Sequence, residues 1–214
     1  MNRRVEPPDS LDLFPTPPWA TRALLRYLIA CSGVVWEPAA GLGHMSEVLK
    51  EFDFDRVVAT DVFPYGEHLD GVGSYVGQGL DVAPAPAGGY DWMITNPPYT
   101  LASEFVLRGL KEARRGVAVL CRSNWAEGET RFRELFEPLP PTLISQFAER
   151  VPMVKGRWDP DASSATAYSW FVWDKHCDED RTEFRFIPPI CRRALERPDD
   201  RRRFGPPASA GSLL

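Results

Sequence analysis

Cysteine and histidine are scarce in this chain, and their spacing does not suit a metal. The 214 residues include three histidines and four cysteines. Cys31, Cys121, Cys177 and Cys191 lie far apart, with no Cys-x-x-Cys pair. Disulfide-stabilised folds depend on many cysteines, and zinc sites depend on closely spaced ligand pairs. The sequence therefore predicts free thiols, no disulfide framework and no metal site.

Long apolar runs and a surplus of positive charge are also missing. No stretch is long and apolar enough to cross a bilayer, and residues 5–10 are polar where a secretory peptide has its apolar core. We therefore expect a cytoplasmic protein without a membrane partner. The formal net charge of −5 argues against broad electrostatic adhesion to nucleic acid, although it permits a local basic face.

The composition is that of one globular domain. The hydrophobic fraction is 43% and the charged fraction 26%, and the length suits a single well-buried core. Proline-rich polar residues open the chain, and arginine clusters lie near its end. We expect a flexible segment over residues 1–10, a single domain over 11–190, and a basic, flexible tail over 191–214.

Strand and helix patterns alternate along most of the chain. Strands are predicted over 34–37, 56–60, 91–95, 116–121, 142–147 and 167–173, with a weaker one near 74–76. Helical patterns cover 20–28, 44–49, 102–113 and 125–136. Such alternation predicts an α/β protein with a doubly wound, mostly parallel sheet, which binds ligands at the carboxyl ends of its strands. Glu37, Asp61, Asp81 and Asn96 all lie at such ends.

A strand, a glycine turn and a helix follow one another over residues 34–49. Gly41 and Gly43 let the backbone approach a ligand closely, and the helix start supplies free amide donors. Asp61 ends the next strand about 20 residues after Gly41, where a carboxylate binds ribose hydroxyls in dinucleotide-binding folds. A nicotinamide oxidoreductase would show the same geometry, but Ser46 stands where the third glycine of its fingerprint belongs.

The turn Asn96-Pro97-Pro98-Tyr99 follows directly on the strand that begins at Asp91. An amine conjugated to a heteroaromatic ring is a poor nucleophile because its lone pair is delocalised. The Asn96 side-chain oxygen and the Pro97 carbonyl offer two acceptors for the amine hydrogens, which would localise that lone pair. Pro98 stiffens the turn, and the ring of Tyr99 can stack on a planar base.

This turn resembles the Asn-Pro-Pro-Tyr signature of class I S-adenosylmethionine (SAM) methyltransferases that act on amino groups, best known among the DNA adenine N6 enzymes. The stretch Glu37-Pro38-Ala39-Ala40-Gly41 is similar to the first motif of these enzymes. Residues 120–125 and 163–173 look like the second half of small phage and prophage adenine methyltransferases. The resemblance covers roughly residues 11–175 and implies a Rossmann-like class I fold.

The resemblance also implies a cofactor site for SAM, which leaves as S-adenosylhomocysteine (SAH). Glu37, Ala39, Gly41 and Gly43 would hold the methionine portion, Asp61 the ribose, Phe63 the adenine ring and Asp81 the adenine amine. Thr16, in the turn Phe14-Pro15-Thr16-Pro17-Pro18, would lie against the methionine end. Asn96, Pro97, Pro98 and Tyr99 would form the catalytic turn, with the target base extruded from its stack and held against Tyr99.

The implied function is methyl transfer to the N6 amine of adenine in DNA. A loop with Arg150, Lys155, Arg157 and Trp158 precedes the last predicted strand, and we expect it to flank the catalytic turn. Its Lys155, Arg157 and Trp158 are candidate DNA-binding residues, because basic side chains position a duplex through its phosphates. No segment is long enough for a separate target-recognition domain, so the target sequence and the oligomeric state stay open.

Other functions fit parts of the same pattern. RNA adenine methyltransferases and protein glutamine methyltransferases also use the Asn-Pro-Pro-Tyr turn, although glutamine enzymes usually carry Asp-x-Gly-x-Gly where this chain has Glu37-Pro38-Ala39-Ala40-Gly41. A non-catalytic SAM-binding module is a further alternative, against which the intact Asn96 and Tyr99 count. The nicotinamide oxidoreductase remains the fourth.

Overall fold

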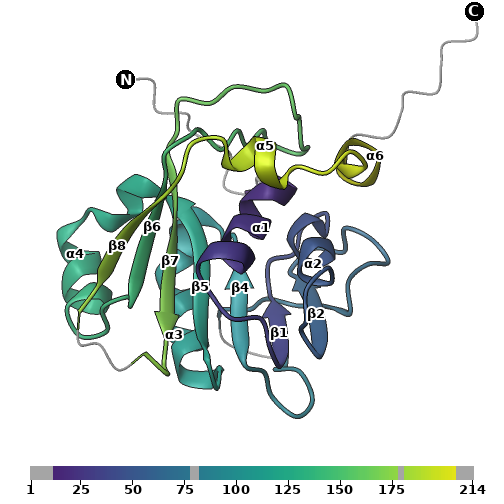
Figure 1. The fold of residues 1–214 in the computed structure, drawn as a ribbon. Coiled ribbons are helices and arrows are strands. Elements are labelled where there is room, and N and C mark those ends of the chain that lie inside the picture. Colours follow the sequence, from purple (N-terminus) through teal and green to yellow (C-terminus); the bar gives the residue numbers. More distant parts are fainter. Residues whose placement is uncertain (1–11, 78–81, 178–180, 206–214) are drawn as a thin grey trace, which may run out of the picture.

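The computed structural model describes residues 12–77, 82–177 and 181–205, and its centre is an eight-stranded sheet in the order β3-β2-β1-β4-β5-β7-β6-β8 (Figure 1). The strands are β1 (Val34–Glu37), β2 (Arg56–Asp61), β3 (Gly71–Val72), β4 (Trp92–Thr95), β5 (Gly116–Arg122), β6 (Leu143–Phe147), β7 (Tyr168–Asp174) and β8 (Glu183–Ile187). Pairing is parallel from β3 to β5 and between β6 and β8, whereas β7 runs antiparallel to β5 and β6. The predicted α/β sheet is therefore confirmed.

Both faces of the sheet are buried, which explains why its central strands are apolar throughout. Successive residues of β5 face opposite layers, so Val117 and Val119 pack in one core cluster and Ala118 and Leu120 in the other. Burial of both sheet faces is typical of parallel sheets covered by helices. In Figure 1, α1 (Pro18–Tyr27) lies on one side of the sheet and α3 (Ala102–Glu112) on the other.

The first helices of the chain follow the predicted pattern, and the predicted helix after β5 does not. The short helix α2 (His44–Leu49) follows β1 as expected, and α1 starts with Pro18 at its first position, where the missing amide costs nothing. The predicted helix over 125–136 is broken into η2 (Ser123–Ala126), α4 (Glu129–Arg131) and η3 (Phe132–Phe136). Gly128 separates the first two at a φ of 116°, which a helix does not tolerate.

The strand predicted near residues 74–76 is absent from the described chain, where Ser74 makes only an isolated bridge with Val82. The edge strand β3 lies a few residues earlier, and η1 (Tyr99–Leu101) connects the Asn-Pro-Pro turn to α3. The last strand, β8, was not predicted, because four of its five residues are exposed and give no periodic burial signal. Among the described residues, no helix has the length and apolar character needed to cross a membrane.

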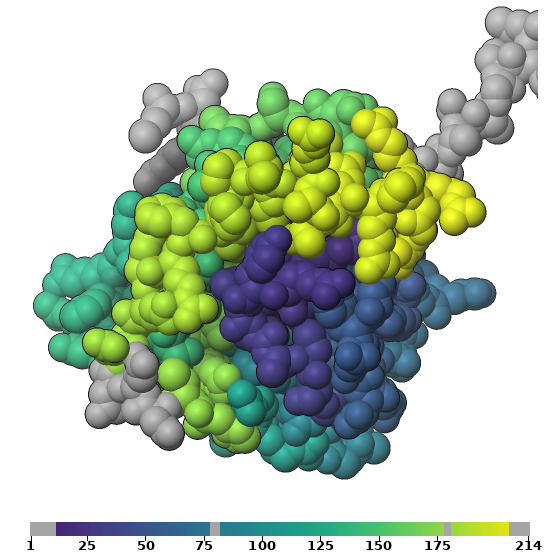
Figure 2. All heavy atoms as spheres, viewed as in Figure 1, coloured from purple at the N-terminus to yellow at the C-terminus, as the bar shows by residue number. Residues whose placement is uncertain are grey.

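The expectation of a flexible tail from residue 191 was wrong for residues 191–205, which form α5 (Cys191–Leu195) and α6 (Asp200–Phe204). A buried ion pair holds them, since the Arg22 guanidinium of α1 donates to both oxygens of Asp200 at 2.6 and 2.7 Å. Glu51, at the end of α2, pairs with Arg22 and Arg203. Figure 2 shows these C-terminal residues in yellow against the purple N-terminal helix.

Candidate functional site

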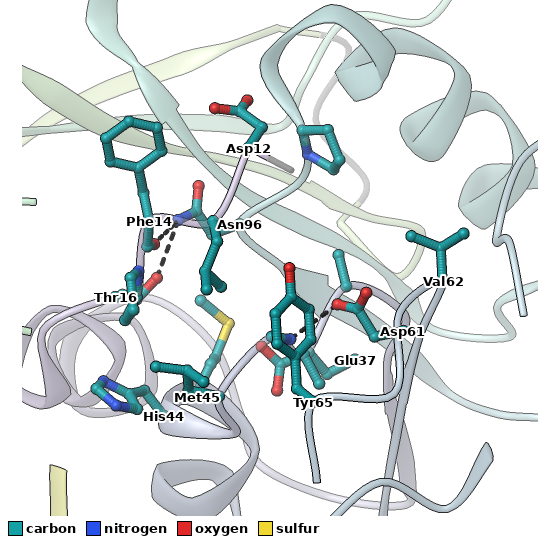
Figure 3. Close-up of a pocket in the computed structure, with 17 residues that line it drawn as sticks. Asp12, Phe14, Thr16, Glu37, His44, Met45, Asp61, Val62, Tyr65 and Asn96 are labelled. Carbon is teal, nitrogen blue, oxygen red and sulfur yellow. Dashed lines mark hydrogen bonds between the residues drawn. The ribbon is translucent and has the colours of Figure 1, made fainter. Parts of the chain in front are cut away.

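Parallel strands β1, β2 and β4 end at one edge of the sheet, and β1 lies between the other two. A crevice at such a topological switch point is the usual ligand site of an open α/β sheet. A cavity, called the first cavity from here on, opens at this edge (Figure 3). It is lined by seventeen residues, which include Thr16, Glu37, Gly41, Asp61, Tyr65 and Asn96. The fold thus brings together side chains from four separate stretches of the sequence.

Glu37, the last residue of β1, is a buried carboxyl group that faces the first cavity. Only 2% of the residue is exposed, and its Oε2 has no hydrogen-bond partner in the described structure. Burial raises the pKa of Glu37 well above its usual range, although hydrogen bonds from Ser46 oppose that shift. A buried oxygen without a partner costs free energy unless a ligand supplies a donor. Glu37 therefore suits a ligand that carries an N–H or O–H donor.

Asp61, the last residue of β2, joins the glycine turn to the turn after β2. Its carboxylate accepts the Gly41 amide at 2.8 Å and the Phe63 amide at 3.0 Å. Burial raises the pKa of Asp61, and the amide hydrogen bonds act in the opposite direction. Each carboxylate oxygen accepts more than one hydrogen bond, so Asp61 keeps acceptor capacity for hydroxyl groups in the first cavity.

Both glycines of the turn combine a positive φ with a close approach of a neighbouring side chain. Gly41 has a φ of 52°, and a Cβ there would lie 2.7 Å from the Leu13 side chain. Gly43 has a φ of 78° at the start of α2, and a Cβ there would lie 2.7 Å from the His68 ring. Of the two, only Gly41 lines the first cavity, together with Ala39. Gly43 therefore shapes the turn from behind the cavity wall.

From the turn after β2, Tyr65 rather than Phe63 lines the first cavity. Phe63 was predicted to pack on an adenine ring, but 45% of it is exposed and it does not line the cavity. Its ring contacts the Tyr65 ring at a centroid distance of 4.9 Å. Figure 3 shows Tyr65 beside Asp61 and Glu37. The sequence held a signal for Tyr65, because it is the second aromatic residue of the same turn.

Asn96, the first residue after β4, is held by the segment that precedes α1. Its side-chain nitrogen donates to the Phe14 carbonyl at 3.0 Å and to the Thr16 hydroxyl at 3.2 Å (Figure 3). A backbone carbonyl only accepts hydrogen bonds, so the NH₂ group of the amide must face it. This fixes the amide orientation and leaves the Asn96 Oδ1 turned away from the N-terminal segment.

A second cavity adjoins the first at Asn96. Pro97, Tyr99, Arg122 and Tyr168 line it, and Asp12, Phe14 and Asn96 belong to the walls of both cavities. Pro97 is buried and Tyr99 half-buried. Pro98 lines the first cavity, on the opposite side of the turn. The turn after β4 therefore lies between the two cavities, and the Asn96 side chain borders both.

The segment 12–16 has a larger role than the sequence suggested. Thr16 is 4% exposed and binds the Asn96 amide, while the Asp12 carboxylate accepts the Tyr99 amide at 3.0 Å. Asp12 was missed as a site residue because a single aspartate in an irregular, proline-rich stretch gives no pattern. Its placement depends on contacts with residues more than 80 positions away.

Trp158 does not lie where the sequence analysis expected it. It was predicted to bind DNA from a surface loop, but only 2% of it is exposed and its ring packs edge-on against Phe204 of α6. Trp158 is a core residue, so that assignment was wrong. Met153 of the same loop lines the second cavity, whereas Lys155 and Arg157 do not. The predicted adenine ligand Asp81 lies outside the described residues.

No family model and no curated protein matches this sequence. The methyltransferase subunit of a type I restriction-modification system from Streptococcus thermophilus superposes with a TM-score of 0.55 at 9% identity, over 82% of this chain and 48% of that one. A modification subunit from Vibrio vulnificus gives 0.48 at 14% identity (83% and 48% covered). A dimethyladenosine transferase from Plasmodium falciparum gives 0.45 at 14% identity (76% and 63%).

This chain spans about half the length of the two subunits from restriction systems. The match to the Streptococcus thermophilus subunit confirms the predicted fold, a Rossmann-like α/β domain of the class I methyltransferase type. At such low identity a structural likeness carries the fold and not the chemistry.

Proposed function

We propose that this protein is a SAM-dependent methyltransferase that methylates the N6 amine of adenine in DNA. The observation that carries the proposal is the fixed amide of Asn96 at the junction of two cavities. With its NH₂ group engaged by Phe14 and Thr16, the Oδ1 atom is available to accept a hydrogen from an amine in the second cavity. The Pro97 carbonyl is the second acceptor of the proposed pair.

The residues around the first cavity fit SAM. The unpartnered Oε2 of Glu37 can accept a hydrogen from the cofactor's ammonium group, and Asp61 can accept from the ribose hydroxyls. Gly41 lines the cavity with backbone alone, because a Cβ at this position would clash with the Leu13 side chain. When bound, SAM supplies an electrophilic methyl group on a sulfonium. Ala39, Thr16 and Tyr65 would complete the cofactor's surroundings.

In this proposal Asn96 and the Pro97 carbonyl accept hydrogen bonds from both amine hydrogens, which localises the nitrogen lone pair and stabilises the positive charge that reaches nitrogen. Tyr99 stacks on the base, while Asn96 and the Pro97 carbonyl hold its amine about 3 to 3.5 Å from the methyl group. The extra proton of the methylated amine passes to solvent. Pro98 keeps Pro97 extended, since a residue before proline avoids the helical region.

The direct test supplies the purified protein with SAM carrying a labelled methyl group and, separately, with DNA, RNA and a glutamine-containing peptide. Mass spectrometry of digested nucleosides should find the label on N6 of adenine from DNA. Label confined to RNA or to glutamine would replace the substrate while keeping the chemistry. Stabilisation by NADH but not by SAH in a thermal-shift assay would overturn the methyltransferase proposal.

We also infer that Lys155 and Arg157 contact DNA phosphates beside the second cavity, because Met153 of their loop lines it. Replacing both with alanine should weaken binding similarly for all sequences and flatten the salt dependence by about two contacts. SAM affinity should stay unchanged. Arg133→Ala, on an exposed arginine paired with Glu129, is the matched control. An unchanged salt slope in the double variant would remove both residues from the DNA-binding surface.

A further inference from the structure

Arg122 is an arginine that neither the sequence motifs nor the proposed chemistry explains. It is the last residue of β5, and β5 runs parallel to β4, so both strands deliver their ends to the same edge of the sheet. The residue is exposed and lines the second cavity with Asn96, Pro97 and Tyr99. Arg122 therefore stands at the mouth of the space in which the acceptor amine would lie.

The guanidinium of Arg122 is held by aromatic side chains. Its central carbon lies 5.2 Å from the centroid of the Tyr99 ring, which is the distance of a cation–π contact. Tyr168, its partner across the β5–β7 ladder, lines the second cavity beside it. Burial raises the pKa of Tyr168, and the positive charge of Arg122 opposes this shift.

Among the described residues, no carboxylate lies within ion-pair distance of Arg122. Many other arginines of the chain are paired with acids, including Arg22, Arg108 and Arg114. A cation–π contact at an exposed site contributes only about 0.5 to 1 kcal/mol, so it yields readily to a stronger partner. An anion at the cavity mouth would be such a partner, because arginine binds phosphate oxygens with two parallel hydrogen bonds.

Arg122 also covers a face of the ring on which the target base is proposed to stack. A planar base on that face of Tyr99 and the guanidinium cannot occupy the same space. When the base enters, the guanidinium loses its aromatic contact and keeps five N–H donors. A nucleotide that enters the cavity carries a negatively charged backbone phosphate, which can accept hydrogen bonds from the freed guanidinium.

We propose that Arg122 is a substrate-binding residue that exchanges its contact with Tyr99 for a phosphate of the extruded nucleotide. The inference rests on the proposed function and narrows its substrate to a nucleic acid strand, because a glutamine side chain brings no phosphate. Entry of the base then displaces the Arg122 guanidinium from the Tyr99 ring. When the second cavity is empty, the guanidinium covers that ring.

The test compares wild-type protein with Arg122→Ala, Arg122→Lys and the control Arg133→Ala. Binding to a fluorescent adenine-containing oligonucleotide is measured by anisotropy with SAH present, at several salt concentrations, and methyl transfer is measured in parallel. Arg122→Ala should weaken binding and raise KM about tenfold, the effect of one lost charged hydrogen bond, and reduce the salt slope by about one. Arg122→Lys should keep the salt slope but bind more weakly than wild type, because lysine acts as a point charge.

SAH affinity should be the same in all four proteins, and the melting temperature of Arg122→Ala should fall by no more than about 4 °C, the effect of losing the aromatic contact, which separates substrate binding from a larger structural role. If Arg122→Ala binds DNA with wild-type affinity and salt slope, the assignment of Arg122 is overturned while the methyltransferase proposal stands. If wild-type protein binds the oligonucleotide with the expected dependence on Arg122 but transfers no methyl group, the inference holds and the proposed chemistry fails. Absence of nucleic-acid binding by wild type overturns both.

Discussion

Replacing Asn96 by alanine gives the sharpest test of the proposed chemistry, when it is paired with Thr16→Val. The alanine variant loses the Oδ1 acceptor for the amine, and it also loses the donor that binds Phe14 and Thr16. Thr16→Val leaves Asn96 in place and removes only one of the two oxygen acceptors that orient its amide. Valine has nearly the shape of threonine, so packing around this buried position changes little.

The two variants should differ in size of effect. Loss of one preorganised group that acts on transition-state charge costs about 100- to 1,000-fold in kcat, and this is the expected effect of Asn96→Ala. Loss of one neutral hydrogen bond costs about 1 kcal/mol, so Thr16→Val should lower kcat only about fivefold. Both variants should bind SAH within a few-fold of wild type, since the main cofactor contacts are proposed to come from Glu37, Gly41 and Asp61.

The assay is single-turnover methyl transfer at saturating SAM and DNA, with SAH affinity measured by calorimetry. If Asn96→Ala keeps more than about a tenth of the wild-type rate, Asn96 does not accept the amine hydrogen and the catalytic assignment falls. If Thr16→Val is as slow as Asn96→Ala, Asn96 contributes to the rate by binding the N-terminal segment through its amide nitrogen. The proposal that Oδ1 accepts the amine hydrogen would then have to be abandoned.

Three further variants test the cofactor site and the packing of the C-terminal helices. Asp61→Ala should weaken SAH binding by about 1 to 3 kcal/mol in calorimetry while DNA affinity is unchanged; equal SAH affinity would contradict the ribose assignment. Burial raises the pKa of Glu37, so ligand-free wild type should lose stability as pH rises from about 4.5, the group's ordinary pKa, towards the raised value. Glu37→Gln should remove that loss, so its melting temperature should exceed that of wild type at pH 8, and the difference should shrink towards pH 4.5. A difference in melting temperature that stays constant with pH would refute the buried charge. Asp200→Ala removes one of the two carboxylate partners of the buried Arg22, leaving Glu51, and should cost about 1.5 to 3 kcal/mol in urea unfolding, against less than about 1 for the exposed Glu129→Ala; equal losses would contradict the buried pair.

Local patterns in the sequence determined most of the sheet and the strand-end residues. The apolar run 116–121 predicted a strand buried on both faces, which the structure contains as β5, and the predicted strand 34–37 has the bounds of β1. Because parallel strands end at one edge, Glu37, Asp61 and Asn96 were expected to converge, and all three line the first cavity. These inferences needed only periodicity and turn chemistry, which neighbouring residues carry.

The tertiary structure decided what depends on residues far apart in the chain. Thr16 and Asp12 gain their places from contacts with Asn96 and Tyr99, which lie 80 and 87 residues away in the chain. Arg122 contacts Tyr99 from the next strand, and no local pattern encodes any of these contacts. Trp158 looked like a surface aromatic because it stands beside basic residues in a predicted loop, yet the packing of α6 buries it. The sequence alone does not distinguish an arginine in a flexible tail from one in an ion-paired helix, because the carboxylate that pairs with it lies elsewhere in the chain. The partners of residues 191–205 are supplied by Arg22 and Glu51, which only the folded chain brings within reach.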